Sequence, residues 1–320
     1  MISNFKVALY DINLTAGSEG LLLPPYKGST LRGSFGAAFQ QIICSQKERV
    51  CLKCMLKHTC PYSYIFETPV PPGAEVLKKY QSIPRPFVIE PPEDTRTHYK
   101  PGDALSFRLV LIGKGITYLP YFVVAFQRLG ELGIGKGRKP FQLKNVNAVN
   151  PMTSEQWPVF NSIEGKLLEN QSYTINGSQI VEYARKQYGQ PSQIEIEFLT
   201  MTRLKYEHNF IKHAEFHIII RNLLRRLSSL AYFHHGHELD VDIKQLLVKA
   251  EQVHIVEDNT RWVDWERFSS RQDRKINLGG IKGKITYEGE MSDFIPLLVL
   301  GELTHVGKGT VFGMGKYKLH

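Results

Sequence analysis

A short glycine-rich turn occurs twice in the chain, each time after an apolar helical segment and directly before a segment of strand character. The first copy spans residues 132–138 and the second, longer copy spans residues 305–315. Hydrophobic spacing around each copy predicts the order strand, helix, strand, strand, helix, strand. This is the order of the ferredoxin-like motif, so the repeat restricts the chain to two similar α+β halves.

The predicted fold class is therefore α+β, with two tandem ferredoxin-like (RRM-like, βαββαβ) domains. We place the first domain at residues 1–150 and the second at 191–320, where the second glycine-rich loop is 307–315. Residues 151–190 are polar and weakly patterned, which predicts an irregular linker. A proline-rich stretch at 69–101 predicts a long irregular connection. The length of 320 residues suits two domains of ordinary size.

Individual elements follow from the period of the apolar residues, which is two in strands and 3.6 in helices. For the first domain we expect strands at 5–14, 62–66, 87–90, 105–112 and 141–146, and helices at 29–43 and 120–132. For the second we expect strands at 193–200, 253–256, 281–287 and 316–319, and helices at 210–233 and 293–303.

All four cysteines fall within residues 44–60, with the spacing C-x6-C-x2-C-x5-C. Two thiolates three positions apart can hold one tetrahedral ion. We therefore predict a metal knuckle inserted in the first domain, in which structural zinc staples a loop and His58 is an alternative ligand. An iron–sulfur cluster, redox disulfides and free thiols are the competing interpretations. Four protein ligands leave no open position, so we expect no catalytic metal; the predicted ligands are Cys44, Cys51, Cys54 and Cys60.

Forty basic and thirty-one acidic side chains give a formal net charge of +9, which favours a polyanionic partner. The cations are dense between residues 267 and 284. On the predicted strands, Lys282 and Lys284 share one face, an arrangement that suits a chain of phosphates. Solubilising charges on a wet sheet face are the alternative for such pairs.

The sequence contains no run of eighteen apolar residues and no basic leader followed by an apolar stretch and a cleavage site. A membrane protein and an exported protein are therefore not expected, and we predict a cytoplasmic protein.

Five motifs resemble the RAMP-superfamily endoribonucleases, which cut CRISPR precursor transcripts into guide RNAs. They are LRGSFG at 31–36, PYSYIFE at 61–67, WVDWERFSSRQ at 262–272, LGGIKG at 278–283 and HVGKGTVFGMG at 305–315. The resemblance covers nearly the whole chain. It implies antiviral defence, with metal-independent cleavage within each CRISPR repeat. In that chemistry the 2′-hydroxyl attacks the adjacent phosphate and leaves a 2′,3′-cyclic phosphate and a 5′-hydroxyl, helped by a general base, a general acid and a cation.

The chain departs from the best-known pattern of this family at the first helix. Many relatives place a catalytic histidine in or just after it, and residues 29–43 contain none. Other relatives use tyrosine, lysine and arginine around that region. By that resemblance, Tyr26, Lys27 and Arg32 are the catalytic candidates here. We add His305, because an imidazole directly before the second glycine loop is a suitable acid or base near neutral pH.

Candidate RNA-binding residues come from the cationic segment and the second glycine loop, where backbone N–H groups can approach a phosphate. Two rival functions remain open: a RAMP subunit that binds repeat RNA inside a CRISPR effector complex without cutting, and a zinc-stapled protein-interaction module. The partners expected are CRISPR repeat RNA and other CRISPR effector subunits. The candidate RNA-binding residues are Arg267, Arg271, Gln272, Arg274, Lys282, Lys284, Gly307, Lys308, Gly309, Gly313, Gly315 and Lys316.

Overall fold

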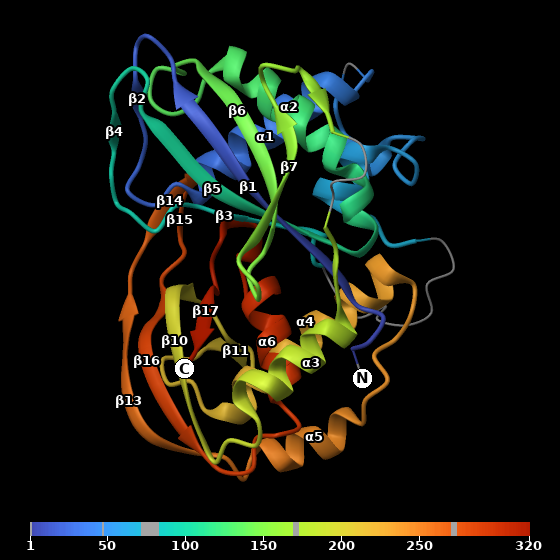
Figure 1. Cartoon of the computed structure of the whole chain (residues 1–320), viewed down its shortest axis with the longest axis vertical. Coiled ribbons are helices and arrows are strands. Elements are labelled where there is room, and N and C mark those ends of the chain that lie inside the picture. The colour runs from blue at the N-terminus through green and yellow to red at the C-terminus, as the bar shows by residue number, and fades with distance from the viewer. Residues whose placement is uncertain (1, 47, 72–82, 169–172, 270–273) are drawn as a thin grey trace. The chain divides into compact units, whose positions relative to one another are not determined.

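The chain forms two compact units in the computed structural model (Figure 1). The N-terminal unit is Val7–Thr174, and the C-terminal unit combines Met1–Lys6 with Ile175–His320. The structure describes residues 2–46, 48–71, 83–168, 173–269 and 274–320.

The N-terminal unit has an antiparallel sheet with the strand order β3-β5-β1-β6, extended beyond β6 by β7 and β8. Helices α1 and α2 pack against one another, and each lies between two strands of the sheet in the chain order. This is the predicted β-α-β-β-α-β arrangement. The elements are β1 (Lys6–Ala16), α1 (Gly28–Ile43), β3 (Phe87–Glu90), β5 (Ala104–Ile112), α2 (Leu119–Leu132), β6 (Phe141–Asn150), β7 (Glu155–Asn161) and β8 (Lys166–Leu167), with a small pair of β2 (Leu21–Leu22) and β4 (His98–Tyr99).

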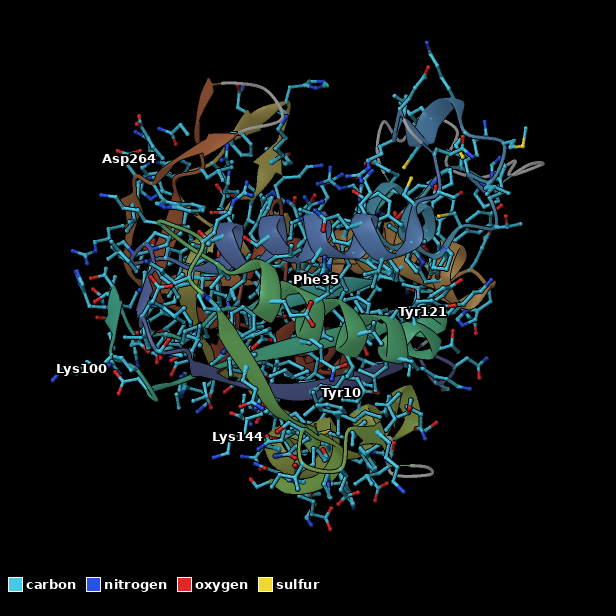
Figure 2. All side chains as sticks on the ribbon, turned by 90° about the horizontal axis from the view of Figure 1, so that it is seen from above. Tyr10, Phe35, Lys100, Tyr121, Lys144 and Asp264 are labelled. Atoms are coloured by element: carbon cyan, nitrogen blue, oxygen red, sulfur yellow. The ribbon has the colours of Figure 1, made fainter. Side chains whose placement is uncertain are left out.

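An aromatic cluster forms the core between the helices of this unit. Phe35 of α1, labelled in Figure 2, stacks on Phe122 and Phe126 of α2, with ring centroids 4.8 and 4.6 Å apart. Phe66 joins the cluster 5.6 Å from Phe35. Such pairs add about 0.5–1.5 kcal/mol each beyond the area they bury, so they fix how α1 lies.

The strand predicted at residues 62–66 is wrong. The chain forms one turn of π-helix there, Ser63–Glu67, which ends at Thr68 in a left-handed conformation. The helical turn brings Tyr62 and Phe66 onto the same side, where their rings stack 5.0 Å apart. A short apolar run has the same appearance in a strand and in a buried helical turn, so the period could not distinguish them.

The C-terminal unit repeats the topology, with the antiparallel strand order β13-β16-β10-β17 and helices α4 and α6 (Figure 1). Its elements are β10 (Gln193–Thr202), α4 (Phe216–His235), α5 (Ile243–Ala250), β13 (His254–Val263), β16 (Gly280–Glu288), α6 (Ile295–Thr304) and β17 (Tyr317–Leu319). Two hairpins are added, β11 (Lys205–Tyr206) with β12 (Asn209–Phe210), and β14 (Glu266–Ser269) with β15 (Arg274–Asn277).

The region predicted as a linker, 151–190, is largely structured. Its first part forms β7 and β8 of the N-terminal unit, and its second part forms β9 (Ile175–Asn176) and α3 (Gly177–Tyr188). A capping box opens α3, because Asn176 Oδ1 accepts from the Gln179 amide and Gln179 Oε1 accepts from the Asn176 amide. Asn-x-x-Gln is a readable start signal, so this helix could have been found from the sequence.

Helix α4 begins six residues later than predicted, at Phe216. The residues before it form the β11–β12 hairpin, whose turn residues Glu207 and His208 have φ of 45° and 70°. Among the described residues, no helix is both long and apolar enough to cross a membrane.

Candidate nucleic-acid interface

The second glycine loop, residues 305–315, is closely packed within its own unit. Gly307 has φ +83°, and a Cβ there would lie 2.4 Å from the Arg203 carbonyl oxygen. A Cβ on Gly315 would lie 1.9 Å from that of Val306. Backbone packing therefore requires glycine at both positions.

Several amides of this loop donate inside the protein. The Lys308 amide bonds to the Arg203 carbonyl at 3.0 Å, and the Gly315 amide to the Met201 carbonyl at 3.1 Å. These N–H groups are committed to the fold. Side-chain cations are therefore the main groups that this loop and its neighbours offer to a phosphate.

Cations and an exposed aromatic ring gather beside the loop; we call this set the basic hairpin surface. The Arg203 guanidinium lies 4.1 Å from the Phe210 ring centroid, and the Lys205 ammonium 5.2 Å. The pKa of Lys308 is lowered by partial burial and by the nearby charges of Arg225 and Lys205. The surface comprises Arg203, Lys205, Phe210, Arg225 and Lys308.

A buried asparagine fastens the hairpin to α4. Asn222, 2% exposed, donates from Nδ2 to the Lys205 carbonyl at 3.1 Å and accepts from the Lys205 amide at 3.3 Å. Its Oδ1 also accepts from Arg225 Nη2 at 3.0 Å. One amide side chain thereby positions two cations of the surface.

The sequence interpretation missed Arg203, Lys205 and Phe210 as binding candidates. The hairpin that presents them turns through Glu207 and His208, which lack the Asn-Gly signal of a tight hairpin. The predicted helix 210–233 includes only Phe210 of this hairpin, and residues 201–209 are predicted in no element.

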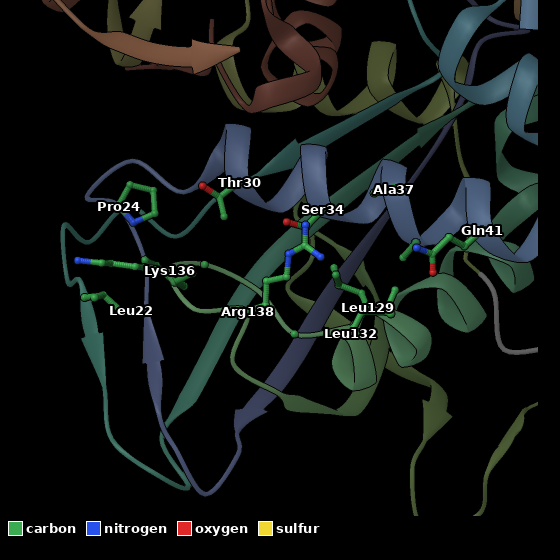
Figure 3. A pocket seen from close by; sticks show the side chains of 14 residues that line it. Leu22, Pro24, Thr30, Ser34, Ala37, Gln41, Leu129, Leu132, Lys136 and Arg138 are labelled. Carbon is green, nitrogen blue, oxygen red and sulfur yellow. The ribbon is translucent and has the colours of Figure 1, made fainter. Parts of the chain in front are cut away.

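The first glycine loop, residues 133–138, borders a pocket of about 600 Å³ (Figure 3). Gly135 lies so close to the Leu22 carbonyl that a Cβ would approach it to 2.3 Å, and the Lys136 amide donates to the same oxygen at 2.9 Å. Across the pocket, α1 presents polar side chains at helical spacing: Thr30, Ser34 and Gln41.

Arg138 reaches from this loop toward Ser34 of α1 (Figure 3). Of the described residues that line the pocket, Lys136 and Arg138 are the two that carry a charge, and both are exposed. The apolar part of the lining comes from Leu22, Leu129 and their neighbours. The pocket thus combines a mainly apolar lining with a few neutral polar groups and two cations at its rim, a combination that suits a nucleotide.

The predicted catalytic residue Lys27 is fully buried in the N-terminal unit, at 0% exposed. Its Nζ donates to Asp94 Oδ1 at 3.1 Å and to the Asp94 carbonyl at 3.0 Å. Lys27 also occupies the N-cap position of α1. These contacts make it an anchor for the start of the helix, and its ammonium is closed to an external phosphate.

The other two candidates near α1 are half-buried. Burial and the charge of Glu90 raise the pKa of Tyr26 well above its ordinary value, so the phenol stays protonated and can only donate a proton or a hydrogen bond. The Arg32 guanidinium lies 4.8 Å from the Phe66 ring centroid, in a cation–π contact. Their catalytic roles stay predictions.

His305 is also fully buried, at 0% exposed, with Nδ1 donating to the Met314 carbonyl at 3.0 Å. It ends α6 with φ 65° and ψ 167°, close to the 78° and 161° with which Gly133 ends α2. This region of backbone space is almost reserved for glycine, so His305 is held there by its surroundings. In this conformation the buried imidazole cannot contact a bound phosphate, contrary to the expectation from the sequence.

The remaining predicted RNA-binding residues are dispersed. Lys282 is exposed on β16 opposite Arg261, whereas Lys284 donates to Glu195 Oε1 at 2.7 Å. The Lys316 amide donates to Thr200 Oγ1. Gly309 and Gly313 both have φ +80° and flank a short 3-10 turn. Arg267 lies on β14 and Arg274 on β15. Arg271 and Gln272 fall outside the described residues.

The four cysteines are half-buried and form no disulfide among the described residues. Burial, Glu67 and the other three thiols raise the pKa of Cys51 to about 11. Nowhere in the described parts of the chain do three His, Cys, Asp or Glu side chains converge tightly enough to hold a metal ion. Zinc at this knuckle therefore stays a prediction.

Two family models match the chain. Residues 5–172 match an N-terminal domain family, AF_1859_N, and residues 196–317 match the CRISPR-associated endoribonuclease Cas6. An uncharacterized protein of Archaeoglobus fulgidus is 23% identical over 306 residues, which cover 93% of this chain and 92% of that protein.

Solved Cas6 structures share the fold. Thermus thermophilus Cas6 matches with a TM-score of 0.56 at 14% identity, covering 99% of both chains. A chain of a partial Cas6-RT-Cas1–Cas2 complex matches with a TM-score of 0.58 at 16% identity, over 99% of this chain. This chain spans 46% of that longer chain and 29% of its counterpart in a second such complex.

The two units, each with the same strand order and its own glycine-rich turn, agree with these matches over the full length. The N-terminal match over residues 5–172 places the chain in the AF_1859_N family, and residues 196–317 of its C-terminal unit belong to the Cas6 family of CRISPR-associated endoribonucleases.

Proposed function

We propose that this protein binds CRISPR repeat RNA and cleaves the precursor within the repeat without a catalytic metal. The 2′-hydroxyl beside the scissile phosphate attacks it, the bond to the 5′-oxygen breaks, and the products carry a 2′,3′-cyclic phosphate and a 5′-hydroxyl. The match of residues 196–317 to the family model of the CRISPR-associated endoribonuclease Cas6 supports the class of reaction. The observation that carries the RNA assignment is the basic hairpin surface of the C-terminal unit.

That surface has the electrostatics of an anion site. Lys308 is destabilised in its charged form by Arg225 and Lys205, and a phosphate placed among them would relieve this repulsion. Phe210 is 37% exposed and has two cations near its ring, so a splayed base that stacks on its exposed part would lie beside positive charge. Each phosphate contact of this kind adds about 0.7 to the salt slope of single-strand binding.

We assign the chemical step to the pocket between α1 and the first glycine loop. Arg138 supplies the cation that stabilises the doubly charged phosphorane-like transition state, and Lys136 is a second cation at the rim. Ser34 and Thr30 can orient the ribose by hydrogen bonds. The proton acceptor and donor stay open, with Tyr26 as a donor candidate because burial keeps its phenol protonated.

A second function is favoured by a specific observation. Lys27 and His305, two of the candidate proton-transfer or charge-stabilising groups, are both closed off inside their units. A subunit that binds repeat RNA for a larger CRISPR assembly and does not cut would have no need of them. The Cas6-RT-Cas1–Cas2 complexes among the similar structures make such an assembly a partner to test.

The deciding experiment incubates the purified chain with repeat-containing RNA in EDTA. Cleavage at one position, with a cyclic phosphate and a 5′-hydroxyl at the new ends, is the expected result. A single 2′-deoxy substitution at the cut site should abolish cleavage and leave binding intact. Tight binding without any cleavage would select the second function, and salt-insensitive indifference to RNA would reject both.

A further inference from the structure

The cations of the basic hairpin surface form no ion pairs within the described residues of the C-terminal unit. Exposed lysines elsewhere in this unit do, as Lys249 does with Asp293. Arg221, four residues before Arg225 on α4, is exposed and has no acidic partner among the described residues either. So much uncompensated positive charge favours an anionic ligand from outside the protein.

Two arginines of α4 are held in place before any ligand arrives. The Arg221 guanidinium lies 5.7 Å from the ring centroid of Tyr206 on β11, and Arg225 donates to Asn222 Oδ1 at 3.0 Å. Residues four apart share one face of a helix and lie about 6 Å apart along its axis. Arg221 and Arg225 therefore present two cations in line, and fixing them in advance lowers the cost of binding an extended chain of phosphates.

The line of cations ends at the start of α4. The ring of His217, four residues before Arg221, meets Tyr206 almost perpendicularly with centroids 5.6 Å apart. Beside it, Glu215 Oε2 lies 3.4 Å from His217 Nδ1, and the Glu215 side chain is 61% exposed. This carboxylate repels phosphate, so the surface suits a segment of only a few nucleotides.

The hairpin register separates its two aromatic rings. Lys205 pairs with Phe210 and Tyr206 with Asn209, and successive residues of a strand point to opposite faces. Phe210 therefore shares a face with Lys205, whose ammonium lies 5.2 Å from its ring centroid, whereas Tyr206 contacts α4. Because Phe210 is 37% exposed, its ring can stack on a base that has an open face, and in RNA that is an unpaired base.

We propose that the basic hairpin surface and Arg221 bind an unpaired segment of RNA, with one base stacked on Phe210 and neighbouring phosphates at Arg221 and Arg225. A base inside a double helix is stacked on both faces, so a duplex would keep phosphate contacts and lose the contact with Phe210. This rests on the proposed function, and it means that the part of the repeat held by the C-terminal unit is single-stranded.

The test compares binding of the full chain to an unstructured repeat-derived strand and to the same strand annealed to its complement, both with the 2′-deoxy nucleotide that blocks cleavage. The parent should bind the single strand at least about tenfold more tightly. Phe210→Leu should lose about tenfold in affinity for the single strand and nothing for the duplex, and Phe210→Trp should keep both affinities. The matched control Phe233→Leu, half-buried near the end of α4, should change neither.

Arg221→Gln tests the phosphate contact. It should lower the salt slope of single-strand binding by about 0.7, and Arg221→Lys, which keeps the charge, should retain the slope. Lys244→Gln removes an equal charge from an exposed position on α5 and should leave the slope unchanged.

Equal affinity of the parent for single strand and duplex, or unchanged single-strand binding by Phe210→Leu, would overturn the proposal and leave the proposed cleavage intact. A slope that is the same for Arg221→Gln and the parent would overturn the assignment of a phosphate to Arg221. Indifference of the parent to both RNAs would reject the proposed function itself.

Discussion

The two glycine-rich loops occupy the same place in two copies of one topology, between the second helix and the closing strand, yet they differ in what surrounds them. The loop at 133–138 borders an open pocket and exposes its own cations, Lys136 and Arg138. The loop at 305–315 folds onto itself around the buried His305, and most cations beside it come from a neighbouring hairpin and α4.

The glycines of both loops are required by close backbone packing, whereas the side chains that would contact a ligand belong to other residues. In each loop two glycines lie so close to a carbonyl oxygen that a Cβ is excluded; they are Gly133 and Gly135 in the first loop, and Gly307 and Gly315 in the second. In neither loop does the motif itself determine which cations are near. The repeated motif therefore predicts where a loop lies in the fold and leaves its function to its neighbours.

The largest effect should come from filling the glycine positions. A Cβ at Gly133 would lie 2.0 Å from the Arg138 oxygen, and one at Gly315 would lie 1.9 Å from the Val306 oxygen. Gly133→Ala and Gly315→Ala should each lower the free energy of unfolding by about 3 kcal/mol or more. Gly165→Ala is the matched control, since Gly165 also has positive φ but has open space around it, and should cost about 1 kcal/mol. Urea unfolding measures all three; equal losses would contradict the packing explanation.

The helices differ in how they meet the closing strands. Gly130 of α2 contacts the Phe141 carbonyl closely, whereas Glu302 of α6 accepts from the Leu319 amide at 2.8 Å. Burial raises the pKa of Glu302 to about 7, although that hydrogen bond and Lys318 lower it. The buried carboxyl is tolerated in its protonated form. The contribution of Glu302 to stability is therefore complete below the ordinary carboxyl pKa and is lost as the pH rises through about 7.

Glu302→Gln should therefore be more stable than the parent at pH 8.5, by up to about 3 kcal/mol relative to their difference at pH 4. The exposed Glu131, paired with Arg128, provides the control: Glu131→Gln should change stability by less than about 0.5 kcal/mol across the same range. A pH-independent difference for Glu302→Gln would show that its carboxyl is not destabilised by burial.

A smaller effect tests why a histidine replaces glycine at the end of α6. His305→Gly relieves backbone strain and loses the buried ring, whereas His305→Ala loses the ring and keeps the strain. The glycine variant should be more stable than the alanine variant by about 1–2 kcal/mol. If His305 is only a structural cap, the glycine variant should cleave RNA at the same single-turnover rate as the parent. A large loss of this rate without a loss of stability would show that His305 takes part in catalysis.

The smallest effect concerns pH and RNA affinity. The pKa of Lys308 is lowered, so its charge is lost at a lower pH than that of an ordinary lysine as the pH rises. RNA affinity should therefore begin to fall at a pH below the usual range of lysine titration. Because arginine keeps its charge, the loss of RNA affinity at alkaline pH should be about threefold smaller for Lys308→Arg than for the parent. Lys284→Arg is the control, because its ion pair with Glu195 raises its pKa. Identical alkaline profiles for the parent and Lys308→Arg would rule out a contribution of Lys308.

The hydrophobic period predicted both β-α-β-β-α-β units, because strands such as β5 and helices such as α2 have one buried face each. It failed for β7 and for the π-turn at Ser63–Glu67, where burial does not follow a single period. The site was less predictable. Arg203, Lys205 and Phe210 become a surface only when the hairpin packs on α4 through Asn222, a contact that no local pattern encodes.

One comparison of two charge-pair variants tests the assignment of binding to the C-terminal unit and of chemistry to the N-terminal pocket. Lys205→Gln/Lys308→Gln should weaken repeat-RNA binding about tenfold and lower the salt slope by about 1.4, with the cleavage rate at saturating protein unchanged. Lys136→Gln/Arg138→Gln should lower that saturating rate about a hundredfold and affect binding less. Equal effects of the two variants on both quantities, or no effect of either, would contradict the account.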